Sequence, residues 1–162
     1  MDIKIVLTGY KGFIGSHYYS YIKDQYDSVC PYDKKNGVAD NLSNATVSKN
    51  APECDVVVHL AATNGTRLFY ETPTDVCINN TLSTINLIER YRNTKTKFVF
   101  ASTCEIFNGA IDEGYYPVPT DEQVPVMFND ITNPRWSYSV PKALGENLVA
   151  NCGLEYLIIR YF

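Results

Sequence analysis

Short apolar runs separated by longer mixed stretches form the main pattern along this chain. The runs are rich in β-branched and aromatic residues, and each is short enough to be a buried strand; they lie at 3–7, 29–33, 55–60, 97–102 and 155–161. The stretches between them predict helices over about 13–26, 43–49, 72–92 and 137–151. Strands that alternate with helices predict an α/β fold, in which a doubly wound parallel sheet carries helices on both faces.

The segment 108–135 interrupts this alternation. It contains four prolines and many polar residues, and we expect a long irregular loop there. A loop of this length in a compact domain usually serves a function. Ligands of such sheets bind beyond the carboxyl ends of the strands, which places 9–15, 61–65 and 102–105 at the expected site.

Three glycines follow the first predicted strand in the spacing G-x-x-G-x-x-G. Gly9 suits a tight turn, Gly12 lets the backbone approach a phosphate, and Gly15 lets the following helix pack closely on the strand. A strand, a glycine turn and a helix together place a pyrophosphate at a helix N-terminus. A purely structural turn is the alternative interpretation.

An acidic residue ends the second predicted strand. Asp33 lies 18 residues after Gly15, close to the offset of about 20 at which a carboxylate binds the adenosine ribose hydroxyls. A carboxylate there repels a 2′-phosphate and favours NAD over NADP, a preference that Lys34 and Lys35 could soften. The alternative is a simple turn residue.

Tyr138 and Lys142 are four residues apart in a predicted helix and therefore share one face. The ammonium group would favour the phenolate and lower the tyrosine pKa. Such a tyrosine can exchange a proton with a sugar hydroxyl. A solvated pair on a helix surface is the alternative. Pro141 requires that the helix begin close to Tyr138.

Composition narrows the function classes. The chain has 162 residues, 45% of them apolar, and a net charge of −4 without a basic stripe, which argues against nucleic acid. No run of 18 apolar residues predicts a membrane span, and the first residues lead directly into a strand without a signal peptide. Five scattered cysteines predict reduced thiols and a cytoplasmic location, and two histidines without ligand spacing predict no metal.

Six short stretches together resemble one family over essentially the whole chain. They are Thr8–Gly15, Asp33, His59–Ala62, Ser102–Phe107, Tyr138-x-x-x-Lys142 and Arg160–Phe162. In this order and spacing they resemble the NAD-dependent epimerase/dehydratase family, the extended short-chain dehydrogenases/reductases that modify nucleotide sugars. The resemblance implies a Rossmann-type fold, NAD as cofactor and a nucleotide sugar as substrate.

The resemblance also implies a role for each matching position. Tyr138 would be the acid/base, Lys142 would hold the nicotinamide ribose and tune Tyr138, and Thr103 would bond the reacting sugar oxygen. An acid at Asp40 would lie near the adenine. The implied cofactor-binding residues are Gly9, Gly12, Phe13, Ile14, Gly15, Asp33, Asp40, Asn41, Leu60, Ala61, Ala62, Tyr138 and Lys142.

Glu105 narrows the implied chemistry further. The stretch Ser102–Phe107 resembles that of sugar-nucleotide 4,6-dehydratases and UDP-glucuronate decarboxylases, in which the glutamate is catalytic, and the stretch 133–140 resembles the decarboxylases most. Cys104 stands where some dehydratases use an aspartate acid, which counts against water elimination. A loop carboxylate without a catalytic role is the alternative for Glu105.

Length is the main departure from the family, whose members are about twice as long. We interpret residues 1–162 as one NAD(P)-binding Rossmann domain that lacks the usual C-terminal substrate lobe. We expect six main strands, an unfinished edge that favours a homodimer or a partner chain, and little turnover by this chain alone. Two functions remain open: an enzyme that oxidises a nucleotide sugar at C4, and a non-catalytic or truncated NAD-binding module.

Overall fold

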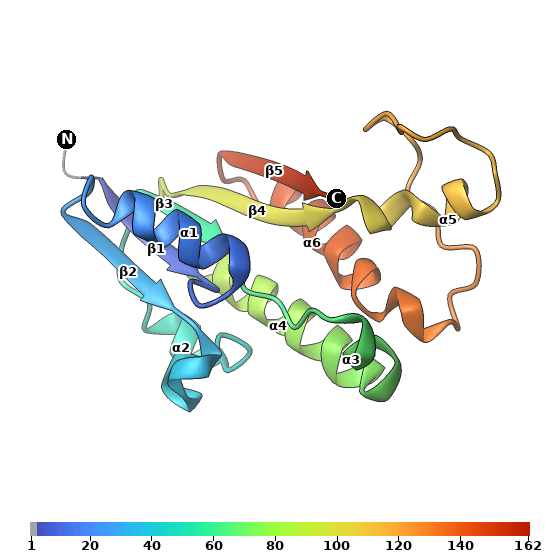
Figure 1. Ribbon diagram of the computed structural model, residues 1–162. Coiled ribbons are helices and arrows are strands. Elements are labelled where there is room, and N and C mark those ends of the chain that lie inside the picture. The colour runs from blue at the N-terminus through green and yellow to red at the C-terminus, as the bar shows by residue number, and fades with distance from the viewer. Residues whose placement is uncertain (1–2) are drawn as a thin grey trace.

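The computed structural model describes residues 3–162, so the expectation for the first two residues lies outside the described part. Five parallel strands form one sheet in the order β2-β1-β3-β4-β5 (Figure 1). They are β1 (Lys4–Thr8), β2 (Ser28–Tyr32), β3 (Val56–His59), β4 (Lys97–Thr103) and β5 (Tyr156–Tyr161). The predicted doubly wound parallel sheet is therefore confirmed.

Six α-helices and four short 3-10 helices connect and extend the strands. The α-helices are α1 (Phe13–Ile22), α2 (Ala45–Lys49), α3 (Thr66–Glu71), α4 (Pro73–Tyr91), α5 (Asn108–Asp112) and α6 (Ser139–Asn151). The 3-10 helices are η1 (Lys34–Asn36), η2 (Val38–Asp40), η3 (Cys104–Phe107) and η4 (Pro134–Ser137). None of the helices within residues 3–162 is long and apolar enough to cross a membrane.

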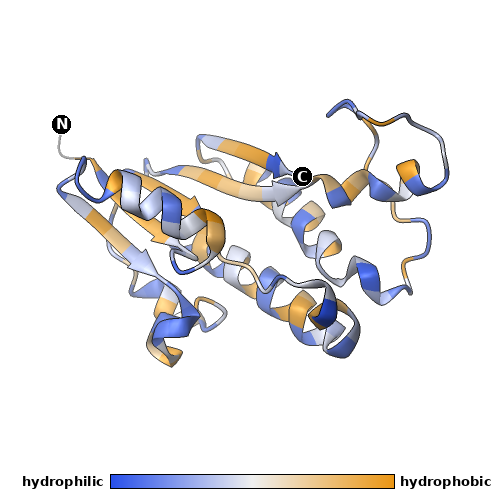
Figure 2. Cartoon of the chain, viewed as in Figure 1, coloured by the Kyte–Doolittle hydropathy of each residue, from blue (hydrophilic) through white to orange (hydrophobic). Residues whose placement is uncertain are grey.

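Side chains of the central strands pack into two hydrophobic cores, one on each face of the sheet. Val6 of β1 packs with Leu87 of α4 and Val149 of α6, whereas its neighbours Ile5 and Leu7 pack with helix α1. Successive strand residues point to opposite faces, so a strand buried on both sides must be apolar throughout. Figure 2 shows hydrophobic colour over much of the central strands.

The expectation of six strands is wrong: the sheet of residues 3–162 has five. The stretch between β2 and β3 contains no further apolar run, and it folds as η1, η2 and the short helix α2. Strand β5 forms one edge, where Leu157 is more than half exposed. The order of the strands reverses between β1 and β3, which places the ligand-binding crevice at their carboxyl ends.

Several helix boundaries differ from the sequence prediction. Helix α1 ends at Ile22 rather than near residue 26, because the polar residues that come next have no core to face. Helix α3 was not predicted, since six residues are too few to show a periodicity. The expected irregular loop begins with α5 and ends with η4, and its middle part extends away from the sheet (Figure 1).

Gly145 allows α6 to lie directly on β4. A Cβ at Gly145 would come within 2.5 Å of the Phe100 ring. We predict that Gly145→Ala destabilises the fold by about 1–3 kcal/mol, the usual cost of overpacking, despite the better helix propensity of alanine. Urea denaturation measures this, with Asn147→Ala on the exposed side of α6 as control. Equal stability of the Gly145→Ala variant and the wild type would contradict the prediction.

Candidate NAD and active site

Two adjoining cavities lie along the carboxyl edge of the sheet. The smaller, of about 140 Å³, lies between the glycine turn and Asp33. The larger is an open cleft of about 960 Å³ that extends from the glycine turn to Tyr138 and Glu105. Every catalytic and cofactor-binding residue expected from the sequence lines one or both cavities.

The glycine turn is too crowded for side chains on its inner side. Gly9 has a φ of 73°, and a Cβ there would lie 2.7 Å from the backbone nitrogen of Ala61. A Cβ on Gly15 would overlap the carbonyl oxygen of Gly9. Helix α1 begins at Phe13 without a side-chain cap or an acidic residue in its first turn. Its first amide groups therefore remain free to bind an anion such as a phosphate.

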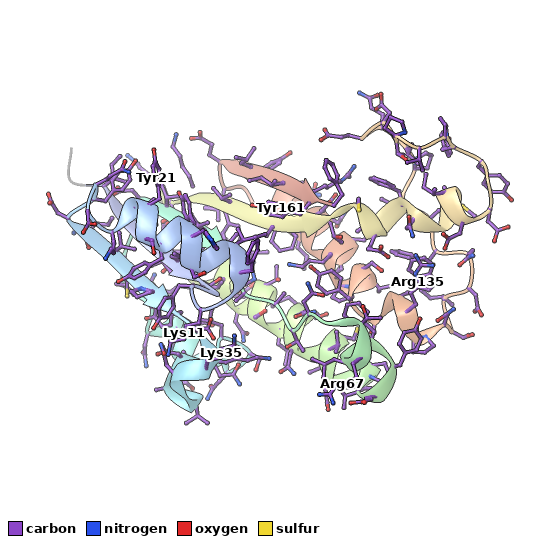
Figure 3. The ribbon with its side chains drawn as sticks, in the orientation of Figure 1. Lys11, Tyr21, Lys35, Arg67, Arg135 and Tyr161 are labelled. Atoms are coloured by element: carbon purple, nitrogen blue, oxygen red, sulfur yellow. The ribbon has the colours of Figure 1, made fainter. Side chains whose placement is uncertain are left out.

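Asp33 connects the glycine turn to the segment after β2. Its carboxylate is buried and accepts backbone N–H groups from Lys11 and Lys35, both at 2.9 Å. The residue is thus a turn cap and also a cavity-lining carboxylate, and its binding of the ribose stays a prediction. Lys11 and Lys35 lie close together at this end (Figure 3), where the Lys35 ammonium donates to the Lys11 carbonyl at 3.3 Å.

A buried histidine fixes the floor between the two cavities. The Thr84 hydroxyl donates to the Asn80 carbonyl at 3.0 Å, so it accepts Nε2–H of His59 at 3.2 Å. Nδ1 of His59 therefore accepts from the Thr8 hydroxyl at 2.8 Å, and that hydroxyl in turn accepts the N–H of Ala61 at 3.1 Å. Burial lowers the pKa of His59 to about 3, so the ring stays neutral and this tautomer persists.

The loop after β3 is held from α4 as well. The Asn80 side chain accepts the N–H of Thr63 at 2.6 Å and donates to the carbonyl of Thr63 at 3.0 Å. The resemblance implied that Ala61 and Ala62 bind the cofactor, but it gave no role to His59 beyond its place in the motif and none to Asn80. The hydrogen bonds of these buried side chains join distant segments of the chain, so they could be identified only from the structure.

Lys142 lies beside Tyr138, as the four-residue spacing predicted. Helix α6 begins at Ser139, so Pro141 falls in its first turn, where it disrupts no helical bond. The Lys142 ammonium donates to the Ala101 carbonyl at 2.6 Å and lies 5.8 Å from the centroid of the Tyr138 ring. Complete burial lowers the pKa of Lys142 to about 8.

The expected lowering of the Tyr138 pKa is wrong for this structure. Burial raises the pKa of Tyr138, and the nearby Glu105 carboxylate and Cys104 raise it further. The ammonium of Lys142 is directed to the Ala101 carbonyl, and its effect does not outweigh these causes. Without ligands, Tyr138 is therefore a neutral phenol.

Helix α3 supplies a contact that sequence reasoning missed. The Phe69 ring stacks on Tyr138 with centroids 5.3 Å apart and an interplanar angle of 14°. The Ser137 hydroxyl donates to the Phe69 carbonyl at 3.5 Å. The phenol of Tyr138 is thus held between Phe69 and the Lys142 side of the cleft.

Thr103 and Glu105 mark the end of β4. The Thr103 hydroxyl accepts the Glu105 N–H at 3.2 Å, which leaves its own hydrogen free for a ligand. The Glu105 carboxylate lies 3.5 Å from Arg135, which also bonds Asp112 at 2.6 Å. Arg135 was not singled out from the sequence. Ser102 Oγ also lines the cleft and has no hydrogen-bond partner within residues 3–162.

Comparison with known proteins gives a family match over almost the whole chain. The model of the NAD dependent epimerase/dehydratase family matches residues 5–162. A protein of Methanocaldococcus jannaschii named as a candidate UDP-glucose 4-epimerase is 31% identical over 97% of this chain and 54% of its own length. The UDP-N-acetyl-alpha-D-glucosaminuronate decarboxylase of Bacillus cytotoxicus is 28% identical over 100% of this chain and 54% of its own.

A solved structure agrees with these matches. The UDP-glucose 4-epimerase of Thermus thermophilus, in complex with NAD, is 25% identical with a TM-score of 0.76, over 98% of this chain and 55% of its own. The chain thus spans about half the length of the relatives it matches.

The lowered pKa of Lys142 gives a testable pH dependence. Below about pH 8 both states carry the proton, and burial of the charge costs stability. Between pH 8 and the unfolded pKa of about 10.4, only the unfolded state binds the proton, so this residue makes stability rise with pH. We predict that Lys142→Met removes this rise.

Chemical denaturation at pH 7, 8, 9 and 10 measures the effect. The difference between the wild type and the variant isolates Lys142 from cysteines and tyrosines that titrate in the same range. Lys95→Met, which removes an exposed lysine, should leave the curve parallel to the wild type. A Lys142→Met curve parallel to the wild type would disprove the predicted shift.

Proposed function

Since the chain belongs to the NAD dependent epimerase/dehydratase family, we propose that it is the NAD-binding and proton-transfer half of a nucleotide-sugar-modifying enzyme, whose reaction begins by oxidation at C4 of the sugar. One observation carries the proposal: Thr103, Glu105, Tyr138 and Lys142 line the same cleft as the glycine turn. A phosphate cradle and a proton-transfer group thus open into one space.

The residues present fit the family's cofactor. The free amides at the start of α1 suit the pyrophosphate, and Gly12 leaves the backbone open toward the cleft. Asp33, Asp40 and Asn41 line the smaller cavity and would hold the adenosine part. NAD, when bound, supplies the hydride acceptor for the sugar carbon.

Tyr138, Lys142 and Thr103 would handle the proton of the sugar C4 hydroxyl. Thr103 has a free hydroxyl hydrogen that can orient the sugar oxygen. Tyr138 is the phenol that exchanges the proton, held in place by its stacking on Phe69. The ammonium of Lys142 is the adjacent positive charge in the cleft, and its pKa of about 8 keeps it mostly protonated at neutral pH. It would favour the developing phenolate.

Glu105 would determine the chemical step after oxidation. A carboxylate in the cleft can remove a proton next to the 4-keto group, or support loss of a carboxyl group. We propose a dehydratase-like or decarboxylase-like reaction rather than simple epimerisation. Cys104 lacks the acidity of a carboxylic acid, since burial raises its thiol pKa, and this supports decarboxylation over water elimination.

A non-catalytic NAD-binding module is the second candidate. It would need only the glycine turn and the smaller cavity, whose lining includes neither Tyr138 nor Glu105. A module would bind NAD but would not transfer hydride from a sugar nucleotide. The two candidates therefore differ in one measurable step.

Asp33 should make NAD the preferred cofactor. We predict that the chain binds NAD about tenfold or more tightly than NADP, because the buried carboxylate repels a 2′-phosphate. Asp33→Asn should narrow the difference, whereas Asp27→Asn, an exposed charge at the start of β2, should not. Calorimetric titration measures both affinities. Equal or tighter NADP binding by the wild type would assign specificity to Lys11, Lys34 and Lys35 instead.

Tyr138 should control transfer of hydride from the sugar. We predict that the chain, given NAD and 4-deuterated UDP-glucuronate or UDP-glucose at high concentration, slowly forms deuterated NADH. Tyr138→Phe should slow this by about 10²-fold or more, as expected for loss of general acid–base catalysis. Tyr21→Phe, an exposed tyrosine of α1, is the matched control. Mass spectrometry measures the label, and NAD binding without any label transfer in the wild type would favour the module.

A further inference from the structure

Arg135 links three elements at the Tyr138 end of the cleft. One guanidinium nitrogen donates to Asp112 of α5 at 2.6 Å, and the other donates to Glu105 of η3 at 3.5 Å. Arg135 itself belongs to η4, the turn that leads into Tyr138. Figure 3 shows it at the opposite end of the molecule from Lys11 and Lys35.

Two further contacts hold Arg135, one at its backbone and one at its guanidinium group. The Asn133 side chain accepts the N–H of Arg135 at 3.0 Å. The guanidinium carbon lies 4.7 Å from the ring centroid of Trp136, which is completely buried and packs edge-on against Phe128. A planar guanidinium stacked on a fixed ring keeps its orientation better than a lysine ammonium would.

The partners of Arg135 are unequal in their surroundings. Asp112 lies outside the set of residues that line the cleft, whereas Glu105 lines it together with Tyr138 and Cys104. Asp112 therefore anchors the guanidinium, and the other nitrogen holds the carboxylate that faces the ligand space. All three side chains are about one-third exposed, so these ion pairs contribute little to overall stability.

The charge of Glu105 reaches the two titratable groups beside it. After burial, Glu105 is the leading cause that raises the pKa of both Tyr138 and Cys104. The other charged groups around this pair are the Lys142 ammonium, Arg135 and, behind Arg135, Asp112. Arg135 is thus the counter-charge in direct contact with Glu105.

We propose that Arg135 is a positioning residue: anchored by Asp112 and Trp136, it fixes the Glu105 carboxylate beside Thr103 and Tyr138 and offsets its negative charge there. This role rests on the proposed function, in which Glu105 acts after oxidation of the sugar. Arg135 would act through Glu105 and not on the sugar itself.

Cys104 is a built-in reporter of this charge. It is partly exposed to the cleft, so iodoacetamide can alkylate its thiolate, and peptide mass spectrometry can resolve it from the other cysteines. The pH midpoint of the alkylation rate reports the local charge without cofactor or substrate. Cys152, at the far end of α6, is the internal reference.

The experiment compares the wild type with Arg135→Gln, Glu105→Gln and the double variant. Arg135→Gln should raise the Cys104 midpoint by about half a pH unit, because the negative charge of Glu105 beside Cys104 would no longer be held and offset. Glu105→Gln should lower it. In the Glu105→Gln background, Arg135→Gln should shift the midpoint by less than half as much, because Arg135 acts through Glu105.

Two controls keep the outcome decisive. Arg92→Gln removes an exposed arginine that pairs with Glu89 and should leave the midpoint unchanged. Arg135→Lys keeps the charge but cannot bridge two carboxylates, so it should raise the Cys104 midpoint by less than Arg135→Gln does. If Arg135→Gln fails to fold, Arg135→Lys replaces it, both in the wild type and in Glu105→Gln. No shift, or equal shifts in both backgrounds, would overturn the positioning role. If the effect of Arg135 on Cys104 depends on Glu105 but no hydride transfer is found, the proposed function is rejected and the positioning role is kept.

Discussion

The close approach of the first helix to the ends of β1 and β3 is the constraint on which this site depends. Gly9 and Gly15 meet there with no space for a Cβ on either, and the backbone of Ala61 completes the contact. This approach directs the free amides of α1 into the cleft. It also leaves the Ala61 N–H to bond the Thr8 hydroxyl, from which the chain of bonds through His59 reaches α4. The phosphate cradle and the floor of the cleft are thus one packed unit.

The opposite end of the cleft depends on burial of charge and polarity. Helix α4 packs beside α6, which carries Lys142 into the space under Tyr138, and the ammonium finds one carbonyl partner there. A buried lysine and a buried phenol both favour their neutral forms. Burial raises the pKa of Tyr138 and lowers that of Lys142 to about 8, which still leaves the lysine mostly protonated at neutral pH. In the proposed function, both side chains are already in place before a ligand binds, and such preorganisation is a common basis of catalysis.

The sequence predicted the strands and the cavity-lining residues well, because both leave local signals. Buried parallel strands must be apolar on both faces, and the glycine turn and Asp33 have fixed offsets. The pKa of Tyr138 was predicted with the wrong sign, since spacing shows that Lys142 is near but not which atom its ammonium bonds. Helix α3, with Phe69, is too short for a periodic signal. Arg135 bonds Asp112, 23 residues away, and Asn80 bonds Thr63, 17 residues away; no local sequence pattern predicts such contacts.

The placement of charged side chains would allow a chain of net charge −4 to bind the anionic ligands of the proposed function. Lysine and arginine side chains lie in and beside the cleft: Lys11 and Lys35 at the Asp33 end, and Lys142 and Arg135 at the Tyr138 end. The glycine turn adds uncharged amide donors between these two groups. Interactions between exposed charges are screened beyond about 8–10 Å in physiological salt, so this local arrangement governs binding more than the total charge does. Under the proposed function, a dinucleotide or a sugar nucleotide would meet these cationic groups and amides in the cleft, whatever the net charge of the remaining surface.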